Sequence, residues 1–125
     1  MILKSLDFKG AGIELKRTVA DVPQFGKGAQ VTLTQLSIKG YLRKNKLHSD
    51  ILKRGLDESQ ATLLVMCAAL MCAMIDPDTG DFLVGDDQLE YFAENVSVDT
   101  LEALVLANNI VNPAHGFETL DAKKK

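Results

Sequence analysis

Five aspartates between residues 76 and 87, which we call the acidic loop, are the densest group of metal-ligating side chains in the sequence. A calcium loop of the EF-hand type that began at Asp76 would need an oxygen ligand at its fifth position, glycine at its sixth and glutamate at its twelfth. The sequence places Gly80, Asp81 and Asp87 at these positions. The turn glycine is therefore displaced and the bidentate glutamate is absent. We expect a turn and a helix start here, not a metal site.

Candidates for nucleophilic catalysis are few. His48, Ser49 and Asp50 are adjacent in sequence, but adjacency does not provide the geometry of a triad, and such polar clusters usually lie on a solvated surface. Cys67 and Cys72 lie in an apolar run, where desolvation raises the pKa of a thiol and makes it inert. The two histidines and two cysteines have no spacing typical of zinc ligands. We expect a protein that is not an enzyme and that carries no cofactor.

The first third of the chain, which precedes these residues, is typical of strands and a loop. Apolar and polar residues alternate over residues 13–19 and again over Gln30–Thr34. Residues 21–28, between them, are rich in turn formers. The pattern predicts a β-hairpin or small sheet, which is marginal alone and must pack on other elements.

From Ser37 onward, apolar residues recur with helical spacing. Ser37 is suited to cap a helix that ends before Gly55, although Gly40 inside it costs about 1 kcal/mol relative to alanine. Asp57 then opens a capping-box variant. Residues 61–75 are apolar on every side, which predicts a central helix that other elements surround.

Two shorter helices are expected after the turn at residues 76–80, one opening with the acids at 86–87 and one capped by Ser97 and ending near Val111. The predicted fold is mainly α (α+β), with the N-terminal hairpin or small sheet packed on a bundle of about four helices. We expect one domain over residues 1–112, β-rich at 13–34 and helical at 37–111, followed by a flexible C-terminal tail at 113–125.

The last of these helices has apolar residues on two nearly opposite faces. At 100° per residue, one face holds four of them: Val98, Leu101, Leu104 and Val105. The other face holds Ala103, Leu106 and Ile110. One face should meet the core, and the other is covered either by the hairpin or tail or by a subunit or partner. Ala103, Leu106 and Ile110 are therefore our candidates for a self-association or partner surface.

Composition narrows the class of partner. The net charge of -3 gives no general attraction to phosphate backbones, so nucleic acid is not an expected partner. The longest apolar run, residues 63–75, is too short to span about 30 Å of hydrocarbon, and the N-terminus lacks the continuous apolar stretch of a signal peptide. We expect a protein of the cytoplasm with reduced cysteines and no membrane contact.

The order of parts from residue 31 to residue 110 resembles the tail assembly chaperones of long-tailed (siphovirus-type) bacteriophages. A strand leads into a polar helix, and an apolar helix then ends at residues 74–75. After it come the turn at 76–81, the apolar segment at 82–84, the acidic start at 86–87 and a Leu-rich helix that ends at 107–110. The first thirty residues contribute nothing to the likeness.

The resemblance implies a function. Similar proteins act in the cytoplasm of the bacterial host and are absent from the mature virion. They bind the tape measure protein, keep it soluble and help tail tube protein to assemble around it, and the spare apolar face also favours a homo-oligomer. Two alternatives stay open: a small structural component of the neck or tail, and a divalent-cation-responsive regulatory protein that uses the acidic loop from Asp76 to Asp87.

Three lysines at residues 123–125 must be encoded by an A-rich stretch, because lysine has only the codons AAA and AAG. In tail assembly chaperones similar to this chain, a backward slip of the ribosome near the end of the gene often yields a longer product. The alternative is a solvated lysine-rich tip.

Overall fold

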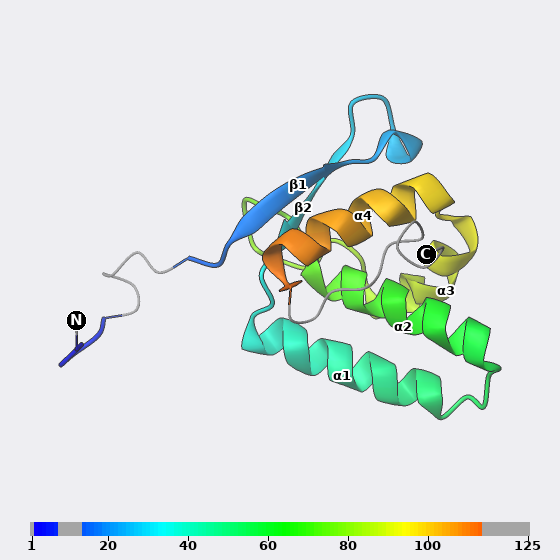
Figure 1. Ribbon diagram of the computed structural model, residues 1–125, viewed down its shortest axis with the longest axis horizontal. Coiled ribbons are helices and arrows are strands. Elements are labelled where there is room, and N and C mark those ends of the chain that lie inside the picture. The colour runs from blue at the N-terminus through cyan, green and yellow to red at the C-terminus, as the bar shows by residue number, and fades with distance from the viewer. Residues whose placement is uncertain (1, 8–13, 114–125) are drawn as a thin grey trace.

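The computed structural model describes residues 2–7 and 14–113, and within them it has four α-helices and a three-stranded antiparallel sheet (Figure 1). The strands are β1 (Arg17–Asp21), β2 (Gln30–Thr34) and β3 (Met74–Ile75). The helices are α1 (Ile38–Leu52), α2 (Glu58–Ala73), α3 (Leu89–Asn95) and α4 (Val98–Val111), with short 3-10 turns η1 (Pro23–Phe25) and η2 (Asp86–Gln88). The predicted α+β class is confirmed. The predicted tail lies, after Pro113, outside the described residues.

The strands β1 and β2 form the expected hairpin, with Ala20 opposite Val31 and Thr18 opposite Leu33. Ala20, Val31 and Leu33 are buried, because these cross-strand pairs share the face that packs on α4. The first strand was expected at residues 13–19, which is too early. The chain turns only at η1, immediately after β1, so the ladder begins later than the alternation alone indicated.

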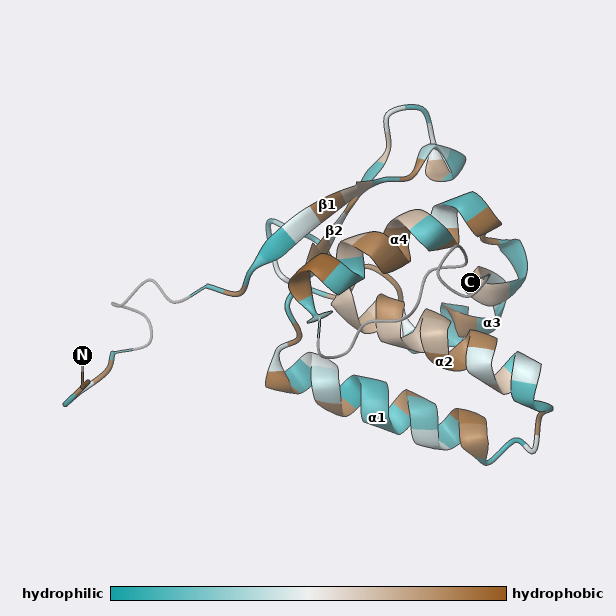
Figure 2. Ribbon diagram, viewed as in Figure 1, coloured by the Kyte–Doolittle hydropathy of each residue, from teal (hydrophilic) through white to brown (hydrophobic). Residues whose placement is uncertain are grey.

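The helix α2 is the centre of the domain. It lies between α1 on one side and α4 with the sheet on the other (Figure 1), and few of its residues beyond the first turn are hydrophilic (Figure 2). Its residues from Cys67 to Ala73 are all buried, as expected for a helix without a polar face. Asp57 caps it, accepting a hydrogen bond of 2.9 Å from the Gln60 backbone N–H.

The end of α2 differs from the prediction. Residues 61–75 were expected to be one helix, but Met74 and Ile75 are extended and form β3. They pair with Leu33 and Thr32 of β2, so tertiary hydrogen bonds replace two residues of helix. The sheet is thereby tied directly to the central helix.

Gly40, which weakened the sequence prediction of α1, is buried where α1 crosses α2. A Cβ atom at this position would lie 3.2 Å from the backbone oxygen of Cys72. The glycine therefore permits a close approach of the two helices, and the helix still starts correctly because Ser37 caps it by accepting from the Gly40 N–H.

A buried asparagine, Asn112, joins three elements just after α4 ends. Its Nδ2 donates to the Thr34 backbone oxygen at the end of β2 and to Asn108 Oδ1, both at 3.0 Å. Its Oδ1 accepts from the Leu36 N–H at 2.7 Å, two residues before α1 begins. One amide side chain thus fixes the end of α4 against the junction of β2 and α1.

Candidate interaction surfaces

The acidic loop is held in place by one arginine of α1. Arg43 donates from Nε to Asp86 Oδ1 at 2.7 Å, from Nη1 to the Met71 oxygen at 3.1 Å and from Nη2 to the Val84 oxygen at 2.6 Å. Its guanidinium also lies 4.3 Å from the centroid of the Phe82 ring. Asp86 therefore neutralises a largely buried arginine through its Oδ1 oxygen.

The remaining part of the acidic loop forms a turn. Asp76 Oδ1 accepts from the Asp78 N–H at 2.8 Å, and the Asp76 backbone oxygen accepts from the Gly80 N–H at 2.8 Å. In the part of the chain that the structure describes, no three His, Cys, Asp or Glu side chains are grouped so that they could hold a metal ion. The loop thus has the structure of a turn that leads into η2, and the turn and helix start predicted here are confirmed.

The cysteines and the polar cluster of α1 do not form a reactive group. Cys67 and Cys72 are buried and form no disulfide with each other, and burial raises the pKa of each thiol to about 11. His48, Ser49 and Asp50 occupy successive positions of α1, so their side chains leave the helix about 100° apart. His115 lies outside the described residues.

The outer face of α4 bears the predicted surface residues. Leu106 is 50% exposed and Ile110 is 70% exposed, whereas Ala103, one turn before Leu106, is partly buried. The opposite side of α4 packs against β1 and β2. Two large apolar side chains therefore face solvent in the described structure, next to one another at a spacing of four residues.

One residue of the predicted core face of α4 is misplaced. Val98 was grouped with Leu104 and Val105, but Val98 is exposed while the other two are buried. Val98 lies about 20° from Val105 around the helix, so its exposure reflects its place as the first residue of α4, beyond the part of the helix that packs on the core. Thr100 takes the buried position in the first turn, where its hydroxyl and that of Ser97 lie 2.9 Å apart in a hydrogen bond.

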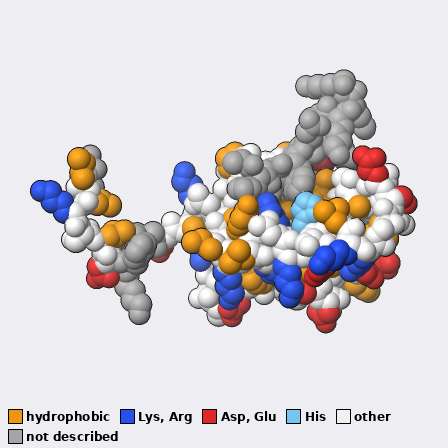
Figure 3. Space-filling model, turned by 90° about the horizontal axis from the view of Figure 1, so that it is seen from below, with side chains coloured by type: hydrophobic (Ala, Val, Ile, Leu, Met, Phe, Trp, Pro, Cys, Tyr) orange, Lys and Arg blue, Asp and Glu red, His pale blue; other side chains and the backbone are white. Residues whose placement is uncertain are grey.

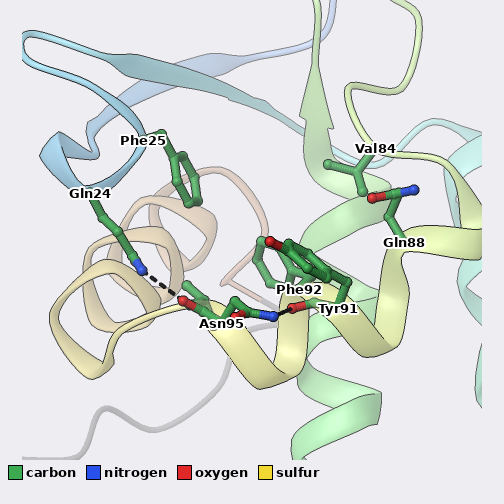
Figure 4. A pocket seen from close by; sticks show the side chains of 8 residues that line it. Gln24, Phe25, Val84, Gln88, Tyr91, Phe92 and Asn95 are labelled. Carbon is green, nitrogen blue, oxygen red and sulfur yellow. Dashed lines mark hydrogen bonds between the residues drawn. The ribbon is translucent and has the colours of Figure 1, made fainter.

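A groove of about 330 Å³, which we call the aromatic groove, lies between η1 and α3 (Figure 4). The exposed ring of Phe25 projects into it from η1, facing the rings of Tyr91 and Phe92 on α3 (Figure 4). It is lined by Gln24, Phe25, Val84, Gln88, Tyr91, Phe92, Asn95 and Val96. An apolar floor with amides around it is suited to take one large apolar side chain of another protein.

The side chain of Gln24 bridges one end of the aromatic groove. Its Nε2 donates to the Asn95 backbone oxygen at 2.7 Å, and its Oε1 accepts from the Ser97 N–H at 2.8 Å. This amide ties the hairpin loop to the junction of α3 and α4. The groove was not predicted, because residues 21–28 have the composition of a turn. The one available signal was Phe25, a large apolar residue among turn formers.

Among the described residues, no helix has the length and apolar character needed to cross a bilayer. No family model matches the chain, and no curated protein matches it. Among solved structures, it is similar to the tail assembly chaperone of bacteriophage HK97, with a TM-score of 0.54 and 18% sequence identity. The match covers 78% of this chain and 87% of that chain. The fold resembles that of a phage tail assembly chaperone, and the expected likeness is confirmed at the level of fold.

Proposed function

We propose that this protein is a tail assembly chaperone of a long-tailed, siphovirus-type bacteriophage. It binds the tape measure protein, keeps it soluble and promotes assembly of tail tube protein around it, without catalysis and without a cofactor. The observation that supports this function best is the likeness to the HK97 chaperone, which extends over most of both chains. It works in the host cytoplasm and leaves before the virion is complete.

Two surfaces are suited to these tasks. The aromatic groove takes an apolar side chain of the tape measure protein between Phe25 and Tyr91, since a pocket of this size with aromatic walls buries one such side chain well. The outer face of α4, with Ala103, Leu106 and Ile110, makes contact between copies of this chain in a homo-oligomer.

The test is co-expression with the tape measure protein of the same phage, measuring how much tape measure protein stays soluble and is recovered with this chain. We expect a soluble complex with the native chain and a large loss with the double variant Phe25→Ala and Tyr91→Ala. The matched control is Val19→Ala, which removes an exposed apolar side chain of β1 outside the aromatic groove.

Two outcomes would contradict the proposal. One is an insoluble tape measure protein that is indifferent to the presence of this chain. The other is recovery of this protein from purified, complete virions, which would instead indicate a structural component of the neck or tail.

A further inference from the structure

The face of α1 that points away from α2 carries side chains at alternating spacings of four and three residues. We call it the α1 stripe, and it consists of Ile38, Leu42, Asn45, Ser49 and Leu52, all exposed. The exposed fractions of Ile38, Leu42 and Leu52 are 82%, 61% and 63%. This alternation is the spacing at which one helix packs against another in a coiled coil, at positions d, a, d, a and d of successive heptads.

Lysines accompany the α1 stripe at a fixed interval. Lys39, Lys46 and Lys53 each follow a d position directly, so all three occupy the e position of their heptad, which faces the flank of a partner helix. All three are exposed, and Asp50 is the one carboxylate on α1. Over the residues that the structure describes, Lys46 and Lys53 form no ion pair, while Lys39 Nζ lies 5.7 Å from the centroid of the Phe82 ring.

The other helices do not share this charge. Residues 55–121 contain no lysine or arginine, so α2, α3 and α4 are without cations and the basic side chains of the helices gather on α1. Figure 3 views the molecule from the side of α1, where Lys and Arg side chains lie beside apolar ones across the face.

The middle of the α1 stripe, at Asn45 and Ser49, is polar. A shallow, wide-open depression extends from there to the end of α1 and is lined by Asn45, His48, Ser49, Leu52 and Lys53. An asparagine at a position that faces a partner helix favours one register over others, since its amide needs a polar partner there. The apolar ends contribute the contact area, and the polar centre selects the alignment.

We propose that the α1 stripe is a docking site for an amphipathic helix of a partner protein whose apolar seam is flanked by acidic residues. The heptad spacing favours a helix as the partner, and the three lysines favour acidic residues on the flank of that helix. The 15 residues of α1 provide a contact about 22 Å long. The inference concerns α1 and does not rest on the proposed function. A second copy of this chain fits less well. The outer side of its α4, which is apolar, has two acids, Asp99 and Glu102, and Glu102 is partly buried and already engaged in another interaction.

The experiment titrates the full chain with synthetic helical peptides of about three heptads, measured by calorimetry at low and at physiological salt. One peptide has leucine at positions a and d and glutamate at e and g, the second has lysine in place of each glutamate, and the third has the composition of the first in scrambled order. We expect binding of the first alone, weakened at higher salt.

Variants of the chain locate the site. Lys46→Glu with Lys53→Glu should weaken binding of the acidic peptide at least tenfold, and Leu42→Asp should abolish it. Lys16→Glu with Lys27→Glu, the same change of charge on the hairpin, should alter it less than twofold. Because the substituted side chains are exposed, thermal unfolding should be unchanged, and circular dichroism verifies this.

The proposal is overturned if the scrambled peptide binds as well as the first, if no peptide binds, or if the hairpin variant weakens binding as much as the α1 variant. It is also overturned if Lys46→Glu with Lys53→Glu changes the sedimentation of the protein alone, because the occupant is then a second copy. Failure to bind the tape measure protein in co-expression would leave these results unchanged, so the two proposals fail separately.

Discussion

Truncation of Arg43 should be among the most damaging single changes in the domain. Its side chain is 11% exposed and makes hydrogen bonds to Asp86, Met71 and Val84. Hydrogen bonds of a charged donor contribute roughly 1.5–3 kcal/mol each, but Asp86 is half exposed and would regain water in the variant. The main cost comes from the two backbone oxygens that lose their donor and from the lost contact with the Phe82 ring.

We therefore expect Arg43→Ala to lower the free energy of unfolding by about 3 kcal/mol, because each of the two backbone oxygens left without a donor costs roughly 1–3 kcal/mol. With an unfolding entropy of about 2.1 cal/mol/K per residue, this corresponds to a fall in Tm of roughly 10 °C. Arg43→Lys should lose about half as much, because a single ammonium retains the charge but cannot reach all three acceptors in a fixed fork.

Urea unfolding followed by circular dichroism gives the measurement, with equal m-values showing that the same surface is exposed in each protein. Arg54→Ala is the matched control, since the Arg54–Glu90 ion pair is exposed to solvent and should contribute less than about 0.5 kcal/mol. A loss below about 1 kcal/mol in Arg43→Ala, or one no larger than in Arg54→Ala, would refute the reasoning.

The other predictions concern separate features. Millimolar calcium should leave Tm unchanged relative to chelator, and a rise of several degrees would show that the acidic loop is a binding site after all. Leu106→Asp or Ile110→Asp should reduce the oligomer seen in sedimentation without unfolding the chain, whereas unfolding would mean that this face belongs to the core. Burial raises the pKa of Cys67 and Cys72 to about 11, above the ordinary value of 9.0, so the folded state holds these protons more tightly. The free energy of unfolding should therefore fall as pH rises from about 9 to about 11. A thiol reagent should modify the two cysteines only after denaturant is added. Modification of the folded protein would refute their burial. Residues 123–125 lie outside the described residues, so the hypothesis of a frameshifted product is tested on the gene. Recoding their codons to AAG should abolish any larger band, and a -1 frame that closes within a few codons rules the hypothesis out.

Much of the fold could be predicted because its signals are local. Ser37, Asp57 and Ser97 were each identified as helix caps, and each accepts a hydrogen bond from the backbone N–H three residues later. The burial of α2 followed from the lack of any polar face. The helical period placed Leu106 and Ile110 opposite the core face but left open whether the hairpin or tail covers them; among the described residues both are exposed.

The features that were missed depend on contacts between distant residues. The two residues of β3 have no strand pattern of their own, and they leave the helix only because β2 offers a partner. Arg43 looks like any surface arginine until the carbonyl groups of Met71 and Val84 converge on it. The aromatic groove joins Phe25 to Tyr91 across 66 positions of sequence, so no local pattern could have indicated it.

The amide of Asn112 also fixes the place at which the described part of the chain ends. Because Asn112 is bonded to the Leu36 N–H and the Thr34 oxygen, Pro113 lies at the junction of β2 and α1. A fluorescent protein, purification handle or natural extension joined at this point would be tethered within a short distance of the α1 surface. The same tether placed before β1 would start from the hairpin instead. The choice of end therefore decides which surface of the protein a fusion shields, and a comparison of the two fusions would distinguish binding at α1 from binding elsewhere.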